Sequence, residues 1–124
     1  MNEILEAKRH LSNAREILRE KAGKEDGLYK DRKYVKMAGH TAYTGILVAL
    51  DGLLGDKRKG RKSVDWYKDE LSSRDKKMLS KFVTAYDILH LSMSYDGNLS
   101  AVVSKEGLDL ADQIISWVEQ KAHA

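Results

Sequence analysis

The residues most suited to chemistry in this chain are five cations within six positions: Lys57, Arg58, Lys59, Arg61 and Lys62. Their segment, GDKRKGRKS, nearly reproduces the phosphate-loop spacing GxxxxGK[ST], but Arg61 intervenes between the second glycine and the lysine. A phosphate loop also follows a strand and opens a long helix, whereas the pattern here predicts a helix before the segment and a short helix after it. We therefore interpret the match as chance. Two alternatives stay open: a solvated loop kept soluble by its charge, or a loop whose cations contact a phosphate or a nucleic-acid backbone.

A second candidate cluster consists of His40, Asp87 and His90. Asp87 and His90 stand three residues apart, so on a helix they share a face and could act as a base with its orienting carboxylate. The alternative is that each histidine is a core residue that hydrogen-bonds a neighbouring side chain. A metal site needs three or four ligands, and the sequence by itself assembles no such set. We therefore predict neither a metal nor a cofactor.

The chain that must position these residues has 124 residues, which fits one domain, residues 1–124, with a core of its own. It has no cysteine, so disulfides and thiolate metal sites are excluded, and a reducing cytoplasm suits it. Charges recur through the first twenty residues, and no apolar run approaches about 18 residues. We therefore expect neither a signal peptide nor a membrane span.

Positive charge is concentrated in the first half of the chain. Residues 1–62 contain fifteen Lys and Arg against nine Asp and Glu, whereas residues 63–124 contain seven against ten. Such an asymmetry favours either an anionic partner or self-association through complementary surfaces.

Apolar residues recur at steps of three and four along most of the chain, which predicts amphipathic helices. The predicted helices cover residues 2–22, 31–54, 64–71, 74–95 and 104–122, and the start of the last one is left open over residues 99–103. Gly23 and the pair Asp26-Gly27 predict a helix end and a turn. No segment reads as paired strands. The predicted fold class is therefore all-α: an up-and-down helical bundle of four long helices plus one short helix.

The stretch from Tyr29 to Gly55 is predicted to contain the central helix of the bundle. Its second half is apolar nearly all round, which is typical of a helix buried on several sides. Three glycines, Gly39, Gly45 and Gly52, interrupt it, each at a cost of about 1 kcal/mol against alanine. Small residues at these positions would let neighbouring helices approach closely.

The order of elements and the pattern YxxxxYxxxAxHTAYxxxxxAL, which begins at Tyr29, resemble the HEPN-like helical bundles of prokaryotes. The stretch AYDILHLS from Ala85 to Ser92, followed by Tyr95-Asp-Gly97, looks like a signature of an uncharacterised family of small helical proteins from Bacteroidetes. Catalytic HEPN ribonucleases are similar in fold but use an Arg followed, after four to six residues, by a His near the end of the fourth helix. The fourth predicted helix has His90 but no Arg beyond Arg74, so the resemblance implies no ribonuclease activity.

What the resemblance does imply is a bundle that dimerises through its helices and acts as a binding or accessory module. We therefore predict a non-catalytic cytoplasmic protein, a homodimer, that binds another protein or itself. The alternative is a nucleotide- or nucleic-acid-binding module that uses the basic loop 57–62. An enzyme that uses His40, Asp87 and His90 is the third hypothesis.

Overall fold

The computed structural model describes residues 2–55 and 62–123 of the chain. Two short π-helical segments continue α-helices, and one two-stranded hairpin joins the first two helices. In chain order the elements are α1 (Asn2–Ile17), η1 (Leu18–Ala22), β1 (Lys24–Glu25), β2 (Leu28–Tyr29), α2 (Arg32–Leu54), α3 (Val64–Ser72), α4 (Lys76–Ala85), η2 (Tyr86–Tyr95) and α5 (Ala101–Ala122).

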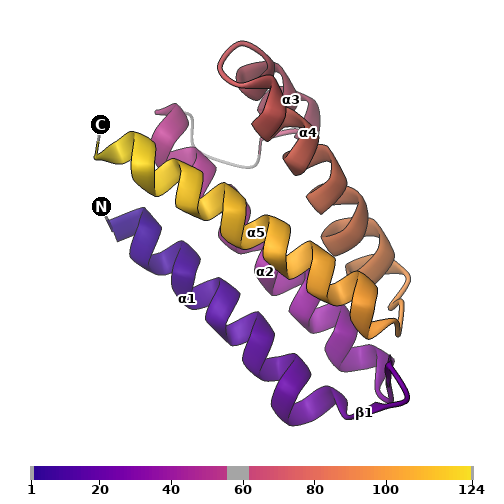
Figure 1. Cartoon of the computed structure of the whole chain (residues 1–124). Helices are drawn as coiled ribbons and strands as arrows, with labels where there is room; N and C mark the ends of the chain where they lie inside the picture. The colour runs from indigo at the N-terminus through magenta and orange to yellow at the C-terminus, as the bar shows by residue number, and fades with distance from the viewer. Residues whose placement is uncertain (1, 56–61, 124) are drawn as a thin grey trace.

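The helices form an up-and-down bundle, which confirms the predicted all-α class. α2 packs against α1, α5 and η2, and α4 packs against α5 and α3 (Figure 1). The two ends of the chain lie at one end of the bundle, and the hairpin lies at the opposite end (Figure 1). None of the helices in residues 2–55 and 62–123 is long and apolar enough to cross a membrane.

The predicted central position of α2 is also confirmed. Asp31 caps its start by accepting a hydrogen bond from the Lys33 amide at 3.0 Å, and Gly55 ends it with a left-handed φ of 66°. Its buried residues occupy more than one side of the helix: Val35, Ala38, Gly39, Ala42, Tyr43, Gly45, Ile46, Ala49 and Leu50. A helix buried this broadly serves as the common wall against which the other helices pack.

Gly39 and Gly45 of α2 allow close helix packing, as the sequence predicted. A Cβ atom built at Gly39 would come within 2.6 Å of both the Leu89 carbonyl oxygen and the Met93 Cβ atom of η2. A Cβ atom at Gly45 would lie 3.0 Å from the His10 Cβ atom and 3.1 Å from the Ala7 carbonyl oxygen of α1. Because these neighbours include backbone atoms, α1 and η2 can approach α2 this closely only where α2 has a glycine.

The fourth predicted helix differs from the structure in its start and its form. It begins at Lys76 rather than near Arg74, because Asp75 caps it by accepting the amides of Lys77 and Met78 at 3.0 and 3.1 Å. From Tyr86 it continues as the π-helix η2. Steps of four and five along η2 place the rings of Tyr86, His90 and Tyr95 in succession, each 5.1 Å from the next.

The prediction that no segment forms paired strands is wrong for residues 24–29. Lys24 pairs with Tyr29 and Glu25 with Leu28 in an antiparallel hairpin. Asp26 and Gly27 occupy its turn with φ of 54° and 80°, and a turn with two positive φ angles matches the twist of a two-residue hairpin. Strands of two residues carry no alternation that a sequence pattern could reveal.

Candidate binding pocket between α1, the hairpin and α5

The hairpin is fixed in place by backbone hydrogen bonds to the segments on both sides of it. The Tyr29 amide donates to the Leu99 carbonyl at 2.8 Å, and the Ala101 amide donates to the Gly27 carbonyl at 2.9 Å. On the other side, the Lys30 and Asp31 amides both donate to the Ala22 carbonyl at 3.1 Å. The hairpin therefore joins the end of η1, which continues α1, to the start of α5.

Side-chain caps fix the start of α5, which the sequence pattern left open. The Ser100 hydroxyl accepts the Val103 amide at 3.2 Å, and the Asn98 side-chain oxygen accepts the Ser100 amide at 2.9 Å. The helix therefore begins at Ala101, which is three residues earlier than the clearly periodic part of the sequence. Its first two turns consequently extend to the hairpin and face the end of α1.

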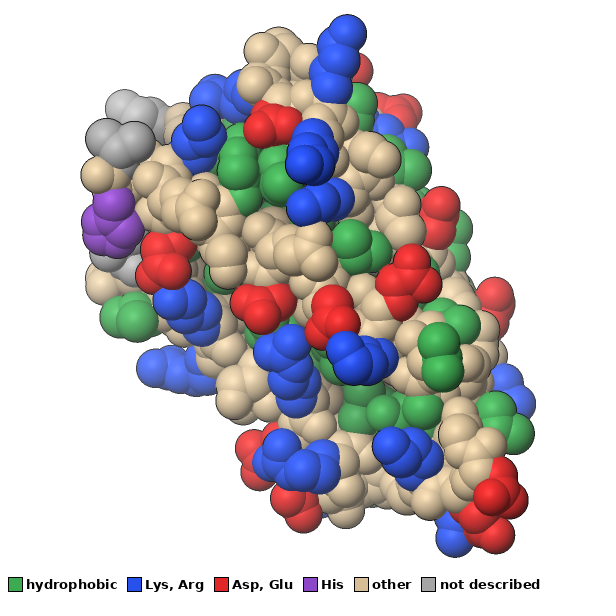
Figure 2. Space-filling model, viewed as in Figure 1, with side chains coloured by type: hydrophobic (Ala, Val, Ile, Leu, Met, Phe, Trp, Pro, Cys, Tyr) green, Lys and Arg blue, Asp and Glu red, His purple; other side chains and the backbone are tan. Residues whose placement is uncertain are grey.

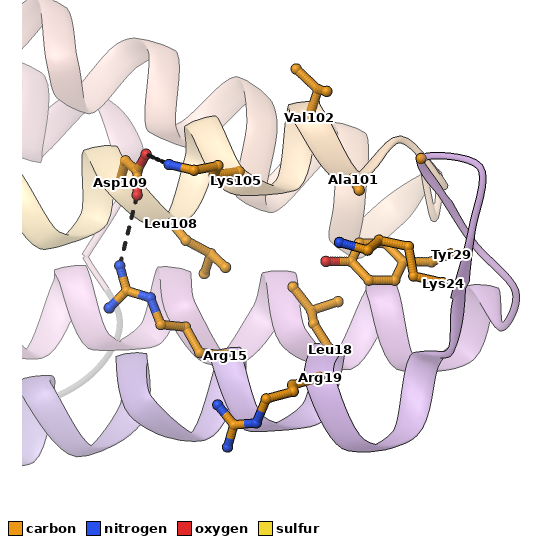
Figure 3. Close-up of a pocket in the computed structure, with 11 residues that line it drawn as sticks. Arg15, Leu18, Arg19, Lys24, Tyr29, Ala101, Val102, Lys105, Leu108 and Asp109 are labelled. Atoms are coloured by element: carbon orange, nitrogen blue, oxygen red, sulfur yellow. Dashed lines mark hydrogen bonds and ion pairs between the residues drawn. The ribbon is translucent and has the colours of Figure 1, made fainter.

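A pocket of about 760 Å³ lies among these three elements (Figure 3). We call it the α1–α5 pocket. Its apolar surface includes Leu18, Ala101 and Leu108, and Leu18 and Leu108 are themselves largely buried. Its remaining lining residues are Arg15, Arg19, Lys24, Gly27, Tyr29, Val102, Lys105 and Asp109. A volume of this size lies within the range of about 300–1,000 Å³ that is usual for small-molecule sites.

Positive charge dominates the lining of the α1–α5 pocket. Four of its side chains are cationic and one, Asp109, is acidic. Figure 2 shows Lys and Arg side chains, with Asp and Glu side chains among them, around exposed apolar atoms on the face where α1 and α5 run side by side. Because the low-dielectric wall of a cleft concentrates the field of its charges, this pocket favours an anion.

The four cations are not equally available to a ligand. Lys105 Nζ lies 2.6 Å from an Asp109 oxygen, and an Arg15 nitrogen lies 3.8 Å from the other oxygen of the same carboxylate. Arg19 forms an ion pair of 3.1 Å with Glu20. Lys24, by contrast, has no ion pair with any residue in the described ranges 2–55 and 62–123. The cation of the lining that has no ion-pair partner among the described residues therefore lies at the hairpin end of the pocket.

Tyr29 places a hydroxyl group beside Lys24. Both side chains project from the hairpin into the α1–α5 pocket, with the phenol oxygen and the ammonium group at the same end (Figure 3). Burial raises the pKa of the Tyr29 phenol above its ordinary value, so the group stays protonated and can donate a hydrogen bond. Within the part of the chain that the structure describes, this hydroxyl forms no hydrogen bond.

The predicted basic loop can be located only at its end. Lys57, Arg58, Lys59 and Arg61 lie outside the described residues. Lys62 is described, and its side chain is only 9% exposed. Its ammonium group lies 3.4 Å from an oxygen of Asp51 and 5.5 Å from the centre of the Trp66 ring, and Asp51 also accepts the Tyr67 hydroxyl at 2.7 Å. Lys62 is therefore engaged in contacts that join α2 to α3.

The structure places two of the three residues of the second predicted cluster on the same π-helix but in different surroundings. His90 packs among the rings of Tyr43, Tyr86 and Tyr95, each 5.1 Å away, whereas Asp87 is exposed. His40 is exposed on α2. Within residues 2–55 and 62–123, no group of three or more His, Asp or Glu side chains is arranged to hold a metal ion.

Sequence reasoning did not identify the α1–α5 pocket. Its residues come from three segments, near positions 15–19, 24–29 and 101–109, and none of these segments carries a motif. The only available signals were the excess of cations in the first half of the chain and the turn pair Asp26-Gly27. Neither signal predicts that the hairpin meets the start of α5.

Comparison with known proteins agrees with this fold. Residues 2–120 match the model of a domain of unknown function, DUF5618. The chain belongs to this family. A solved structure of a protein of unknown function from Dyadobacter fermentans, a member of the Bacteroidetes, is 58% identical in sequence, with a TM-score of 0.92. The match covers 97% of this chain and 96% of that one. No curated protein matches the chain.

The DUF5618 match and the Bacteroidetes relative support the predicted resemblance to an uncharacterised family of small helical proteins. The resemblance to HEPN-like bundles stays a prediction from the sequence.

Proposed function

We propose that this DUF5618 protein is a non-catalytic binding module and that the α1–α5 pocket is its binding site for an anionic partner. The observation that carries the proposal is the combination in one cavity of an apolar floor, Leu18 and Leu108, with Lys24, a cation that forms no ion pair with the described residues. A few well-placed polar groups around an apolar cavity are the usual composition of a ligand site.

The chemistry of the lining favours binding over catalysis. The described residues around the pocket include no His, Cys or Ser, which are the usual nucleophiles and proton carriers. Asp109, the acidic residue of the lining, is engaged by Lys105 and Arg15. Lys105 and Arg15 thus occupy the two different oxygens of its carboxylate.

Reversal of one charge tests the proposed site. The probes are the aromatic sulfonate 1-anilinonaphthalene-8-sulfonate, inorganic pyrophosphate and an oligoglutamate peptide, each titrated against the labelled protein by amide NMR. We expect at least one probe to shift amides of residues 15–29 and 101–109, and Lys24→Glu to weaken that binding at least tenfold.

The matched control is Lys76→Glu, which makes the same change in net charge at an exposed residue at the start of α4. The control should leave the binding unchanged, and circular dichroism should show that both variants are folded. The proposal would be contradicted if none of the three probes bound, or if both variants weakened the binding equally.

We also propose that the protein forms a homodimer, as the sequence predicted, through the exposed side of α2 and η2. Three large apolar side chains are exposed on these two elements: Met37 (43%), Leu91 (38%) and Tyr95 (66%). Exposed charges of opposite sign accompany them, with Lys33 and Lys36 on α2 and Asp87 on η2. Two copies related by a twofold axis could therefore bury apolar surface and pair opposite charges in one contact.

The nucleic-acid alternative receives less support from the described residues. Lys62 is largely buried and bound to Asp51, so it is not available to a phosphate. Contacts from Lys57, Arg58, Lys59 and Arg61 stay a prediction, as does the cytoplasmic location.

A further inference from the structure

We infer that the α1–α5 pocket binds a small amphipathic anion, with its carboxylate or phosphate group at Lys24 and Tyr29 and its apolar body over Leu18 and Leu108. This inference rests on the proposed function and adds the chemical class and the orientation of the ligand.

The orientation follows from how the cations of the pocket are paired. At the end formed by α1 and α5, Asp109 lies 2.6 Å from Lys105 Nζ and 3.8 Å from an Arg15 nitrogen, so a second anion there would meet a carboxylate. At the hairpin end, no carboxylate is among the lining residues, and Lys24 and Tyr29 project into the cavity (Figure 3). An anionic group therefore finds its strongest attraction at the hairpin.

Lys24 and Tyr29 are suited to one anionic group. They are paired across the hairpin in register, so their side chains leave the strands on the same face. An ammonium group and a phenol hydroxyl can each donate to a different oxygen of a carboxylate or phosphate, and such charge-assisted bonds are about twice as strong as neutral ones. The backbone bonds from the Tyr29 amide to the Leu99 carbonyl and from the Ala101 amide to the Gly27 carbonyl fix the strands that carry both donors before the ligand arrives.

The apolar part of the ligand is inferred from the side chains in the middle of the pocket. Leu18 and Leu108 lie between the hairpin end and the Arg15–Asp109 end (Figure 3). Ala101 and the ring of Tyr29 add further apolar surface. A bare inorganic anion would leave this surface in contact with water, whereas an acyl or aryl group would cover it.

A small molecule fits these features better than a nucleic acid. Nucleic-acid backbones are bound by rows of free cations, but in this pocket Arg15 and Lys105 share a carboxylate and Arg19 is paired with Glu20. The apolar floor has no counterpart in a phosphate backbone. An acidic peptide is the remaining competitor, and the experiment includes it.

The test is a calorimetric titration of the full chain with acetate, butanoate, hexanoate, octanoate and octanol, and with the oligoglutamate peptide. We expect the affinity to rise about threefold to fourfold for each added CH₂ group that is buried. Octanol, which has an alkyl chain like that of octanoate but no charge, should bind at least tenfold more weakly than octanoate.

Two variants test where in the pocket the anionic group of the ligand binds. Lys24→Gln and Tyr29→Phe should each weaken octanoate binding about tenfold or more while leaving octanol binding unchanged, because each removes a donor to the charged group. The matched control Lys76→Gln should change neither. Melting curves of all the variants show whether the fold is retained.

Three results would overturn the inference while the proposed function stands. They are acetate binding as tightly as octanoate, octanol binding as tightly as octanoate, or Lys24-dependent binding of the oligoglutamate peptide alone. If no anionic probe binds in a manner that depends on Lys24, both the inference and the proposed function are wrong.

Discussion

At the scale of single residues, Tyr43 shows how packing changes the chemistry of a side chain. It is 8% exposed, and its ring lies among those of Phe82, Tyr86 and His90, at 6.4, 5.7 and 5.1 Å. Burial, and to a smaller extent the neighbouring Tyr86, raises the pKa of Tyr43 to about 12. The native state therefore binds this proton more tightly than the unfolded chain does.

We expect the free energy of unfolding to fall as the pH rises from about 10 to about 12. In that window an ordinary tyrosine of the unfolded chain, with a pKa of about 10, has lost its proton while native Tyr43 retains it. Urea unfolding at several pH values measures this slope. Tyr43→Phe should reduce it, whereas Tyr95→Phe, at a position 66% exposed, should not. An unchanged slope in Tyr43→Phe would contradict the assignment.

At the scale of elements, the contact between α2 and η2 depends on the absence of a side chain at Gly39. An alanine there would be the better helix former by about 1 kcal/mol. Its Cβ atom, however, would come within 2.6 Å of the Leu89 carbonyl oxygen, and a backbone atom in a packed helix cannot move aside without shifting η2. The steric cost outweighs the gain in propensity.

Gly39→Ala should therefore destabilise the protein by about 1–3 kcal/mol, the usual cost of overpacking. Gly45→Ala is the matched comparison, because its nearest neighbours are at 3.0 and 3.1 Å and the closest is the His10 side chain. It should cost less than Gly39→Ala. Chemical denaturation measures both values. Equal stability of Gly39→Ala and the native protein would show that η2 moves more freely than its packing indicates.

At the scale of the whole molecule, the proposed homodimer predicts how the chain sediments. The proposed dimer buries Met37, Leu91 and Tyr95, so a charge in place of Tyr95 should separate the copies. We expect sedimentation velocity to show a dimer for the native protein and a monomer for Tyr95→Glu.

Leu5→Glu is the control for this experiment, because Leu5 is 64% exposed on α1, outside the proposed contact. It should sediment as the native protein does. A native protein that sediments as a monomer at all concentrations would rule out the dimer, without bearing on the α1–α5 pocket.

The pattern of apolar residues determined most of the fold by itself. Helix periodicity is local, so it placed the helices to within a few residues, and the breadth of the apolar face identified α2 as the central element. Cap chemistry is equally local, and Asp31 and Gly55 act as their residue types predict. The form of η2 was not predictable, because its residues also satisfy the periodicity of an α-helix.

The candidate site was decided by tertiary structure. The most conspicuous charged segment ends in Lys62, which is buried against Asp51 and Trp66. The pocket instead depends on Lys24 and Tyr29, whose availability follows from contacts between segments about seventy residues apart. Charge and periodicity are properties of a sequence, but whether a cation is paired or free depends on which distant side chains fold against it.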